Sequence, residues 1–147
     1  MFDDGLLAGR FAACPACGEK FVVPGIPFVH GKGEFDFDIV GESHYQETLE
    51  LIAGGWTYDG CHLCVDAIVL PEDSNLSDKQ AVRVDISGAT VGYLTREDAR
   101  RWRRWLVRKG LELSPVTCKA LITGGWNRGG DDWGHFGVRL DFPLRPT

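Results

Sequence analysis

Apolar and polar residues alternate along several short segments of this chain. Residues 35–40 read Phe-Asp-Phe-Asp-Ile-Val, and Val82, Val84 and Ile86 alternate with charged residues. A period of two is typical of a strand with one buried face. Other apolar segments bounded by turn residues predict further strands, at 61–70, 90–94, 116–123 and 136–142.

Helical spacing is present in two other segments. Residues 45–53 predict a short helix that ends at Gly54. A longer helix is predicted to begin after Thr95, a good N-cap residue with Asp98 three positions on, and to end at Gly110. The apolar stripe of this longer helix consists of Ala99, Trp102 and Leu106.

The order of these elements predicts the fold class. A strand and a short helix are followed by three strands, a helix and two strands. Helices are too few for a doubly wound parallel sheet, whereas short strands joined by tight turns favour a small, mostly antiparallel barrel. We therefore expect a mainly β domain with two helices over residues 35–142, preceded by an irregular N-terminal extension over residues 1–34.

The composition is that of one ordinary globular domain. The chain has 147 residues, of which 44% are hydrophobic, enough to form a core without disulfides. No segment approaches the roughly 18 consecutive apolar residues of a membrane span. The acidic N-terminus also differs from the basic start of a secretory signal. These features predict a cytoplasmic protein without membrane association, whose cysteines are reduced.

Charge is distributed unevenly along the chain. The net charge is −5, but seven of the 16 Lys and Arg residues lie between Arg96 and Lys109, beside only two acidic residues. This segment alone carries +5. A basic helix face on an acidic protein can meet a phosphate backbone, or it can simply be solvated, and the charge pattern leaves both interpretations open.

Two Cys-x-x-Cys pairs suggest a structural Zn²⁺ site. Cys14 and Cys17 flank Pro-Ala and precede Gly18, as in a zinc knuckle, and Cys61 and Cys64 have the same spacing. Four thiolates would close a tetrahedral site. The second pair lies in a predicted strand, where residues three apart face opposite sides, so the site would need a local bulge. The alternative is four reduced thiols.

Three segments in order resemble the HIRAN domain: IVGESHYQ at 39–46, AIVLPEDSNLSDKQAVRVDI at 67–86 and VGYLTREDARRW at 91–102. The resemblance covers about residues 35–142. It implies an OB-like or SH3-like six-stranded antiparallel barrel with two helices. HIRAN domains occur alone in bacteria and phages, and at the front of certain ATPases that remodel stalled replication forks. In the eukaryotic members they hold the 3′-hydroxyl end of single-stranded DNA.

The resemblance also implies a set of nucleic-acid-binding residues. Asp78 would accept a hydrogen bond from a terminal hydroxyl and repel a phosphate. Tyrosine and histidine rings would stack on bases, which contributes roughly 1–3 kcal/mol per base, and Arg83 would meet a phosphate. The full set is Ser43, His44, Tyr45, Asn75, Asp78, Arg83 and Tyr93.

Two departures from the family pattern accompany this set. Leu76 and Ser77 stand where DNA-binding members carry Pro-Tyr, and Ser43 replaces a basic residue. Each predicted site residue also has a simpler interpretation. Asn75 and Asp78 are common turn formers, and the two tyrosines could belong to the core or to the start of a helix.

The leading functional hypothesis is therefore a module that binds single-stranded DNA 3′ ends in DNA repair or replication-fork processing, with a helicase or nuclease as a candidate partner. The alternative is a zinc-stabilised protein-interaction or regulatory module. The loop tryptophans, Trp126 and Trp133, are additional stacking candidates. We expect no enzymatic activity, because the chain lacks a phosphate-binding loop, a nucleophile elbow and a metalloprotease motif.

Overall fold

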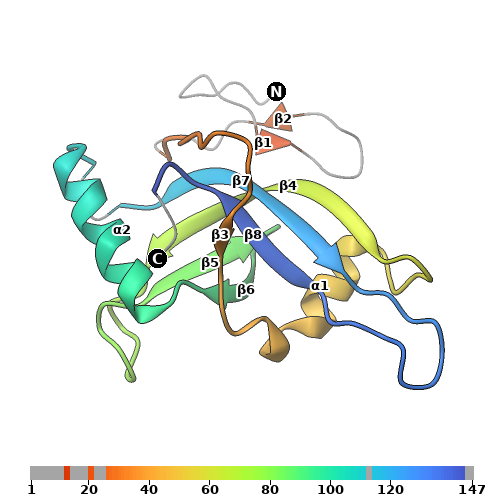
Figure 1. The fold of residues 1–147 in the computed structure, drawn as a ribbon. Coiled ribbons are helices and arrows are strands. Elements are labelled where there is room, and N and C mark those ends of the chain that lie inside the picture. Colours follow the sequence, from red (N-terminus) through yellow and green to blue (C-terminus); the bar gives the residue numbers. More distant parts are fainter. Residues whose placement is uncertain (1–11, 14–19, 22–25, 112–113, 145–147) are drawn as a thin grey trace.

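A computed structural model describes residues 12–13, 20–21, 26–111 and 114–144. Strands dominate the chain, and helices α1 and α2 lie near opposite ends of the main sheet (Figure 1). The elements are β1 (Ala12–Ala13), β2 (Lys20–Phe21), β3 (Phe37–Asp38), a 3₁₀ turn η2 (Glu42–His44), α1 (Gln46–Ala53), β4 (Cys61–Pro71), β5 (Val82–Ile86), β6 (Ala89–Tyr93), α2 (Arg96–Arg108), β7 (Val116–Gly124) and β8 (Gly137–Asp141).

Six strands form one antiparallel sheet in the order β3-β8-β7-β4-β5-β6. The sheet curls until its two outer strands approach each other. Val40, just after β3, and Tyr93 in β6 exchange backbone hydrogen bonds of 2.7 and 2.9 Å. A Cβ added to Gly92 would lie 2.7 Å from the Val40 carbonyl, so glycine permits this approach. The predicted mainly β class with two helices is confirmed, and the curled sheet is consistent with a small OB-like barrel.

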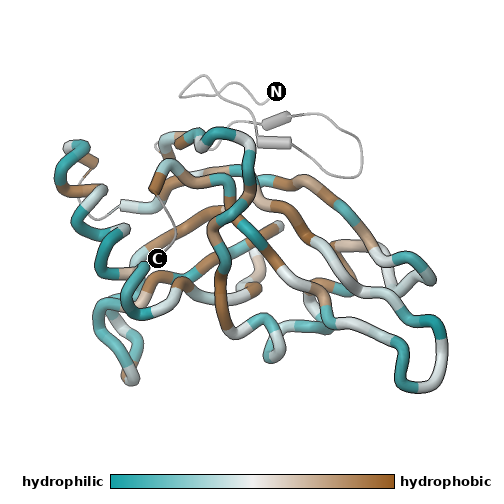
Figure 2. The backbone as a smooth tube through the Cα atoms, in the orientation of Figure 1, coloured by the Kyte–Doolittle hydropathy of each residue, from teal (hydrophilic) through white to brown (hydrophobic). Residues whose placement is uncertain are grey.

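The predicted alternation of buried and exposed residues is confirmed in the central strands. Val82, Val84 and Ile86 of β5 are buried, and the intervening Arg83 and Asp85 are half-buried. Hydropathy accordingly changes from residue to residue along the strands and is mostly polar along α2 and the loops (Figure 2). Complete burial of each large aliphatic side chain contributes about 1.5–3 kcal/mol, so this pattern supplies much of the stability.

Helix α2 begins and ends where the sequence predicts. The Thr95 hydroxyl accepts a hydrogen bond from the Asp98 amide at 3.0 Å, and Gly110 follows the last turn with φ of 73°. Trp102 is fully buried and Trp105 is 9% exposed. Both indoles contact the Phe142 ring, at centroid distances of 6.5 and 5.3 Å. These contacts fix α2 against the sheet and leave Arg104 and Arg108 exposed on its outer face.

The first strand is shorter than predicted, because Phe35 has φ of 49° and interrupts the extended backbone. N-terminal to β3, residues 27–29 pair with β7 at Thr117. This position lies beyond Lys119, where the pairing of β7 with β8 ends. The Thr117 amide donates to the Pro27 carbonyl, and the Val29 amide donates to the Thr117 carbonyl, both at 2.8 Å. Part of the expected N-terminal extension therefore adjoins the sheet. The domain boundary at residues 34–35 stays a prediction.

Candidate nucleic-acid interface

A carboxylate at the end of β4, Glu72, connects several of the predicted site residues. Its Oε1 accepts hydrogen bonds from the Tyr93 hydroxyl at 2.9 Å and from Asn75 Nδ2 at 2.8 Å. Its Oε2 accepts from Arg83 Nη1 at 2.9 Å. Arg83 in turn donates from Nε to Asp85 Oδ1 at 3.0 Å. We call these five residues the Glu72 network.

The pKa values in the Glu72 network follow from these bonds. Burial acts to raise the pKa of Glu72, but hydrogen bonds from Asn75, Arg83 and Tyr93 outweigh it and lower the pKa. Burial raises the pKa of Tyr93, and the bond to Glu72 adds to this effect. At neutral pH Glu72 is therefore ionised, and the Tyr93 hydroxyl keeps its proton and donates it to Glu72.

Two rings from the first predicted loop adjoin the Glu72 network. The Tyr45 side chain contributes to the raised pKa of Tyr93, and η2 and α1 contact β6, so the two tyrosine side chains are neighbours. The His44 and Tyr45 rings meet edge to face, with centroids 6.5 Å apart. His44 is exposed and both tyrosines are half-buried. Ser43 is exposed on η2.

The loop between β4 and β5 carries the network toward α2. Asn75 Oδ1 accepts hydrogen bonds from the backbone amides of Ser77 and Asp78, at 2.8 and 3.0 Å. Asp78 Oδ1 accepts from the Gln80 amide at 3.0 Å, and its Oδ2 lies 3.9 Å from Arg96 Nε. Asn75 and Asp78 thus shape the loop, as the simpler interpretation expects. The Asn75 amide also donates a hydrogen bond to Glu72, and the Asp78 carboxylate lies near Arg96.

The structure therefore joins most of the predicted residues into one strip, which runs from His44 and Tyr45 through the Glu72 network to Asp78. Glu72 itself was not anticipated. The sequence shows only an acidic residue directly after a strand. The role of Glu72 becomes visible once β4 pairs with β5, because Pro71 then lies opposite Val82 and Glu72 comes close to Arg83. Arg83 was expected to meet phosphate, and its guanidinium instead already pairs with two carboxylates.

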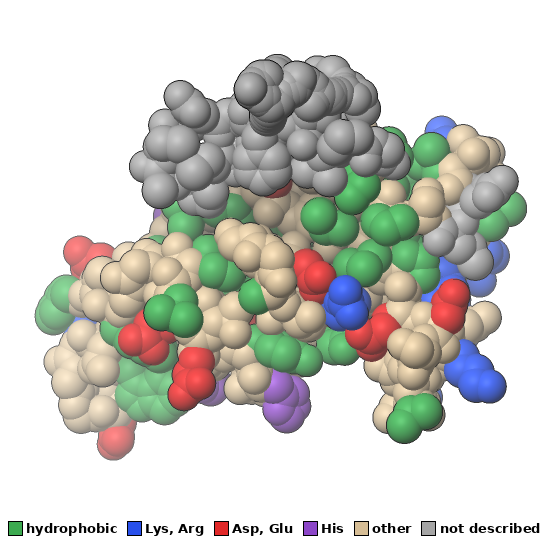
Figure 3. Space-filling model, turned by 180° about the vertical axis from the view of Figure 1, so that it is seen from behind, with side chains coloured by type: hydrophobic (Ala, Val, Ile, Leu, Met, Phe, Trp, Pro, Cys, Tyr) green, Lys and Arg blue, Asp and Glu red, His purple; other side chains and the backbone are tan. Residues whose placement is uncertain are grey.

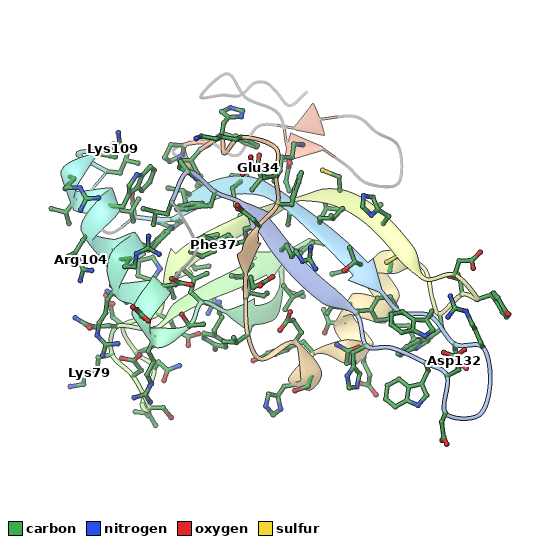
Figure 4. The ribbon with its side chains drawn as sticks, in the orientation of Figure 1. Glu34, Phe37, Lys79, Arg104, Lys109 and Asp132 are labelled. Carbon is green, nitrogen blue, oxygen red and sulfur yellow. The ribbon has the colours of Figure 1, made fainter. Side chains whose placement is uncertain are left out.

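Helix α2 presents the exposed basic groups. Arg103 is occupied, because it donates to the carbonyls of Gln80 and Ala81 at 2.8 Å and pairs with Asp73 at 3.0 Å. Arg104 and Arg108 are exposed and have no ion-pair partner within the described part of the chain. Figure 4 shows Arg104 and Lys109 pointing away from the sheet, at the same end of the molecule as Lys79.

The surface around the Glu72 network is not uniformly basic. Its carboxylates, Glu72, Asp78 and Asp85, lie beside the guanidinium groups of Arg83 and Arg96. A hollow of about 590 Å³ lies elsewhere, between residues 30–36 and 141–144, and contains none of the predicted site residues. The candidate interface is therefore a surface strip, and phosphate attraction has to come from α2.

The structure bears only partly on the zinc hypothesis. Cys14 and Cys17 lie outside the described residues. Cys61 is half-buried, with its thiol 3.5 Å from the Ile122 carbonyl, whereas Cys64 is exposed. They occupy opposite faces of β4, so one metal ion could take both thiolates only after a local change in the strand. The described residues contain no group of three or more potential ligands. Zinc binding stays a prediction.

Comparison with known proteins adds no relative. No family model, curated protein or solved structure matches the chain. Among the described helices, none has the length and hydropathy needed to cross a membrane. The functional assignment consequently depends on the residues and their geometry.

Proposed function

We propose that this chain is a HIRAN-like module that binds the 3′ end of single-stranded DNA, in DNA repair or replication-fork processing. One observation carries the proposal. The three sequence segments that resemble the HIRAN domain each supply residues to the strip around Glu72, although they are far apart in the sequence. A set of turn formers and core residues without a shared role would not need to meet at one place.

The chemistry of the strip suits a terminal hydroxyl better than a terminal phosphate. Glu72 and Asp78 are acceptors, and a 3′-phosphate placed beside them would be repelled, whereas a hydroxyl would donate a hydrogen bond. Tyr45, Tyr93 and His44 offer ring faces or edges to the last bases. In this proposal Arg83 positions Glu72 and does not itself bind phosphate.

The remaining phosphates of the strand would meet α2. Arg96 is 70% exposed and lies between Asp78 and the rest of the helix, and the exposed Arg104 and Arg108 follow it. Each neutralised phosphate releases counterions, so affinity should fall steeply with salt. The proposed module performs no chemistry itself and would deliver a DNA end to a helicase or nuclease partner in the cytoplasm.

The alternative, a protein-interaction module that a zinc ion stabilises, is favoured by a different observation. An aromatic surface lies at the other end of the molecule from α2, in the loops at residues 54–60 and 125–136. The two functions are compatible, because they would use different faces.

The proposal is tested with labelled single-stranded oligonucleotides that differ only in the 3′ terminus. Fluorescence anisotropy should show a 3′-hydroxyl strand binding about tenfold more tightly than a 3′-phosphate strand. Tyr93→Ala should weaken binding of the hydroxyl strand by about tenfold, as expected for loss of one stacked base. Asp78→Asn should reduce the discrimination between the two ends.

Asp38→Asn is the matched control, because Asp38 is a largely exposed acid on β3 whose carboxylate lies 3.5 Å from Arg139. This variant should bind both strands as the wild type does. Equal affinity of the wild type for both ends, or no binding of either, would contradict end recognition.

A further inference from the structure

Two loops meet at the end of the molecule opposite α2. Residues 54–60 connect α1 to β4, and residues 125–136 connect β7 to β8 (Figure 1). The Thr57 amide donates to the Gly125 carbonyl at 3.1 Å, and the Asn127 amide donates to the Thr57 carbonyl at 2.8 Å. Backbone hydrogen bonds therefore hold the two loops in one arrangement, and their side chains form a single surface.

Aromatic side chains dominate this surface. Trp133 is 47% exposed and Tyr58 is 66% exposed. Trp133 rests on Trp56, with ring centroids 6.2 Å apart, and Trp56 packs against Phe136 at 4.9 Å. The Trp126 indole lies so close to Gly134 that no Cβ would fit there. We call Trp56, Tyr58, Trp126 and Trp133 the aromatic end surface; packing holds its tryptophans in place, although Trp133 and Tyr58 remain exposed.

An arginine of the same loop already occupies part of this surface. The Arg128 guanidinium lies 5.2 Å from the centre of the Tyr58 ring and 5.8 Å from that of Trp126. Its Nη1 is 3.7 Å from Asp132 Oδ1. Arg128 thus shows which chemical group these rings accept: a planar cation stacked on an aromatic face and paired with a carboxylate.

The charge around the aromatic end surface is negative. Residues 46–60 and 124–136 contain five carboxylates and one arginine, a net charge of −4. Within the described part of the chain, Asp132 is the only one of these carboxylates with an ion pair. Figure 3 shows acidic and hydrophobic side chains gathered at this end of the molecule, and Asp132 projects there in Figure 4. The other carboxylates are Glu47, Glu50, Asp59 and Asp131.

This combination disfavours the polyanion first considered for the loop tryptophans. Nucleic-acid surfaces that stack bases on aromatic rings also carry basic groups for the phosphates. Here the rings are surrounded by carboxylates that would repel each phosphate and attract a cation. Rigid exposed tryptophan and tyrosine are also the residues that most often provide the binding energy of protein interfaces.

We propose that the aromatic end surface binds an arginine-containing basic segment of a protein partner. An incoming guanidinium would stack on the exposed face of Trp133 and pair with Asp131, as Arg128 stacks on Tyr58 and Trp126 and pairs with Asp132. Arginine is preferred to lysine because its planar, weakly hydrated head group stacks on an indole. The surface lies at the opposite end from α2, so the partner and a DNA strand can bind together.

The test uses a short labelled peptide of alternating arginine and glycine, with lysine and glutamate versions as comparisons. Fluorescence anisotropy should rank the affinities arginine, lysine, glutamate, with no measurable binding of the glutamate peptide. Trp133→Ala should weaken the arginine peptide about tenfold. Tyr58→Ala is a second variant at a more exposed position, and it should also weaken binding, because Arg128 loses the Tyr58 ring and its guanidinium can then compete with the peptide for Asp131. Asp131→Asn should weaken binding less.

Val107→Ala is the control, because Val107 is an exposed apolar residue on α2, 61% exposed. It should bind the arginine peptide as the wild type does. Failure of the wild type to bind, equal binding of the glutamate peptide, or insensitivity to both Trp133→Ala and Tyr58→Ala would overturn the proposal. Concentration-dependent association that Arg104→Glu abolishes would overturn it too, because the occupant would be α2 of a second copy.

Peptide binding and DNA-end binding are separable by the same variants. Trp133→Ala should leave oligonucleotide binding unchanged, and Tyr93→Ala should leave peptide binding unchanged. Loss of both activities in either variant, with an unchanged circular dichroism spectrum, would contradict the assignment of the two ligands to separate surfaces.

Discussion

The two ends of the molecule contain the same kinds of side chain in opposite arrangements. In α2 the tryptophans are inside and two of the arginines are fully outside: Trp102 and Trp105 are buried, and Arg104 and Arg108 project into solvent. In the loops at the other end Trp133 is half exposed, and Arg128 lies over aromatic rings. Composition alone would say only that both segments contain tryptophan and arginine.

The difference arises from the backbone. A helix repeats every 3.6 residues, so side chains three and four apart share a face and the apolar ones pack against the sheet. The loops have no such period, and their rings are placed by hydrogen bonds between two distant segments, such as those joining Thr57 to Gly125 and Asn127. Tryptophan in α2 therefore supports the fold, whereas tryptophan in the loops is available for binding.

The largest expected effect tests this contrast directly. Trp102→Ala should lower the free energy of unfolding by about 3–5 kcal/mol, because it leaves a large cavity between α2 and the sheet. Trp133→Ala should cost no more than about 1 kcal/mol, because half of its side chain is already solvated. Urea denaturation of both variants measures these values. Similar losses in the two variants would remove the distinction between a structural and a binding tryptophan.

The carboxylates of the two ends provide the next test. Glu72→Ala should destabilise the protein by about 2–3 kcal/mol, because Arg83, Tyr93 and Asn75 all lose an acceptor. Asp131→Asn should change stability by less than about 0.5 kcal/mol, since Asp131 is exposed. Chemical denaturation compares them. A large loss in the Asp131 variant would mean that the acids of the aromatic end are structural.

Reversing charge on α2 should affect binding and leave stability nearly unchanged. Arg104→Glu combined with Arg108→Glu should weaken oligonucleotide binding about tenfold or more. It should also reduce the slope of log affinity against log salt by about 1 for each phosphate that the helix no longer neutralises. Anisotropy titrations over a range of salt concentrations measure both quantities. Unchanged binding of DNA would leave α2 as a solvated helix face, and weaker binding of the arginine peptide would contradict the separation of the two ends.

The smallest expected effect is a pH dependence of stability with opposite signs at two carboxyls. The folded-state pKa of Glu72 is below its ordinary value of 4.5, so its contribution is complete above that value and is lost as pH falls through the folded pKa. Burial raises the pKa of Glu42, so its contribution is present below the ordinary value and is lost as pH rises through the folded pKa.

Urea midpoints measured from about pH 3 to about pH 6 separate the two carboxyls. Glu72→Gln should flatten the loss of stability on acidification, and Glu42→Gln should improve relative stability at the upper end of this range. The same pH profile in both variants would show that neither carboxyl acts as its surroundings indicate.

Much of the fold could be predicted from local patterns. The alternation in β5 and the capping of α2 by Thr95 and Gly110 are properties of neighbouring residues, so the sequence shows them directly. The short first strand was harder, because a positive φ at Phe35 has no sequence signal. Glu72 was missed for a different reason, since its role depends on a partner that lies eleven residues away and only the strand pairing makes them adjacent.

The sequence by itself determined which segments are strands or helices and which face of each is apolar, because periodicity acts between residues a few positions apart. Tertiary structure decided which segments meet. It brought Val40 to Tyr93 so that the sheet curls, gathered the first loop and the Asn75 loop around Glu72, and joined two glycine-rich loops into the aromatic end surface. These arrangements depend on register and closure over long separations, which no local pattern specifies.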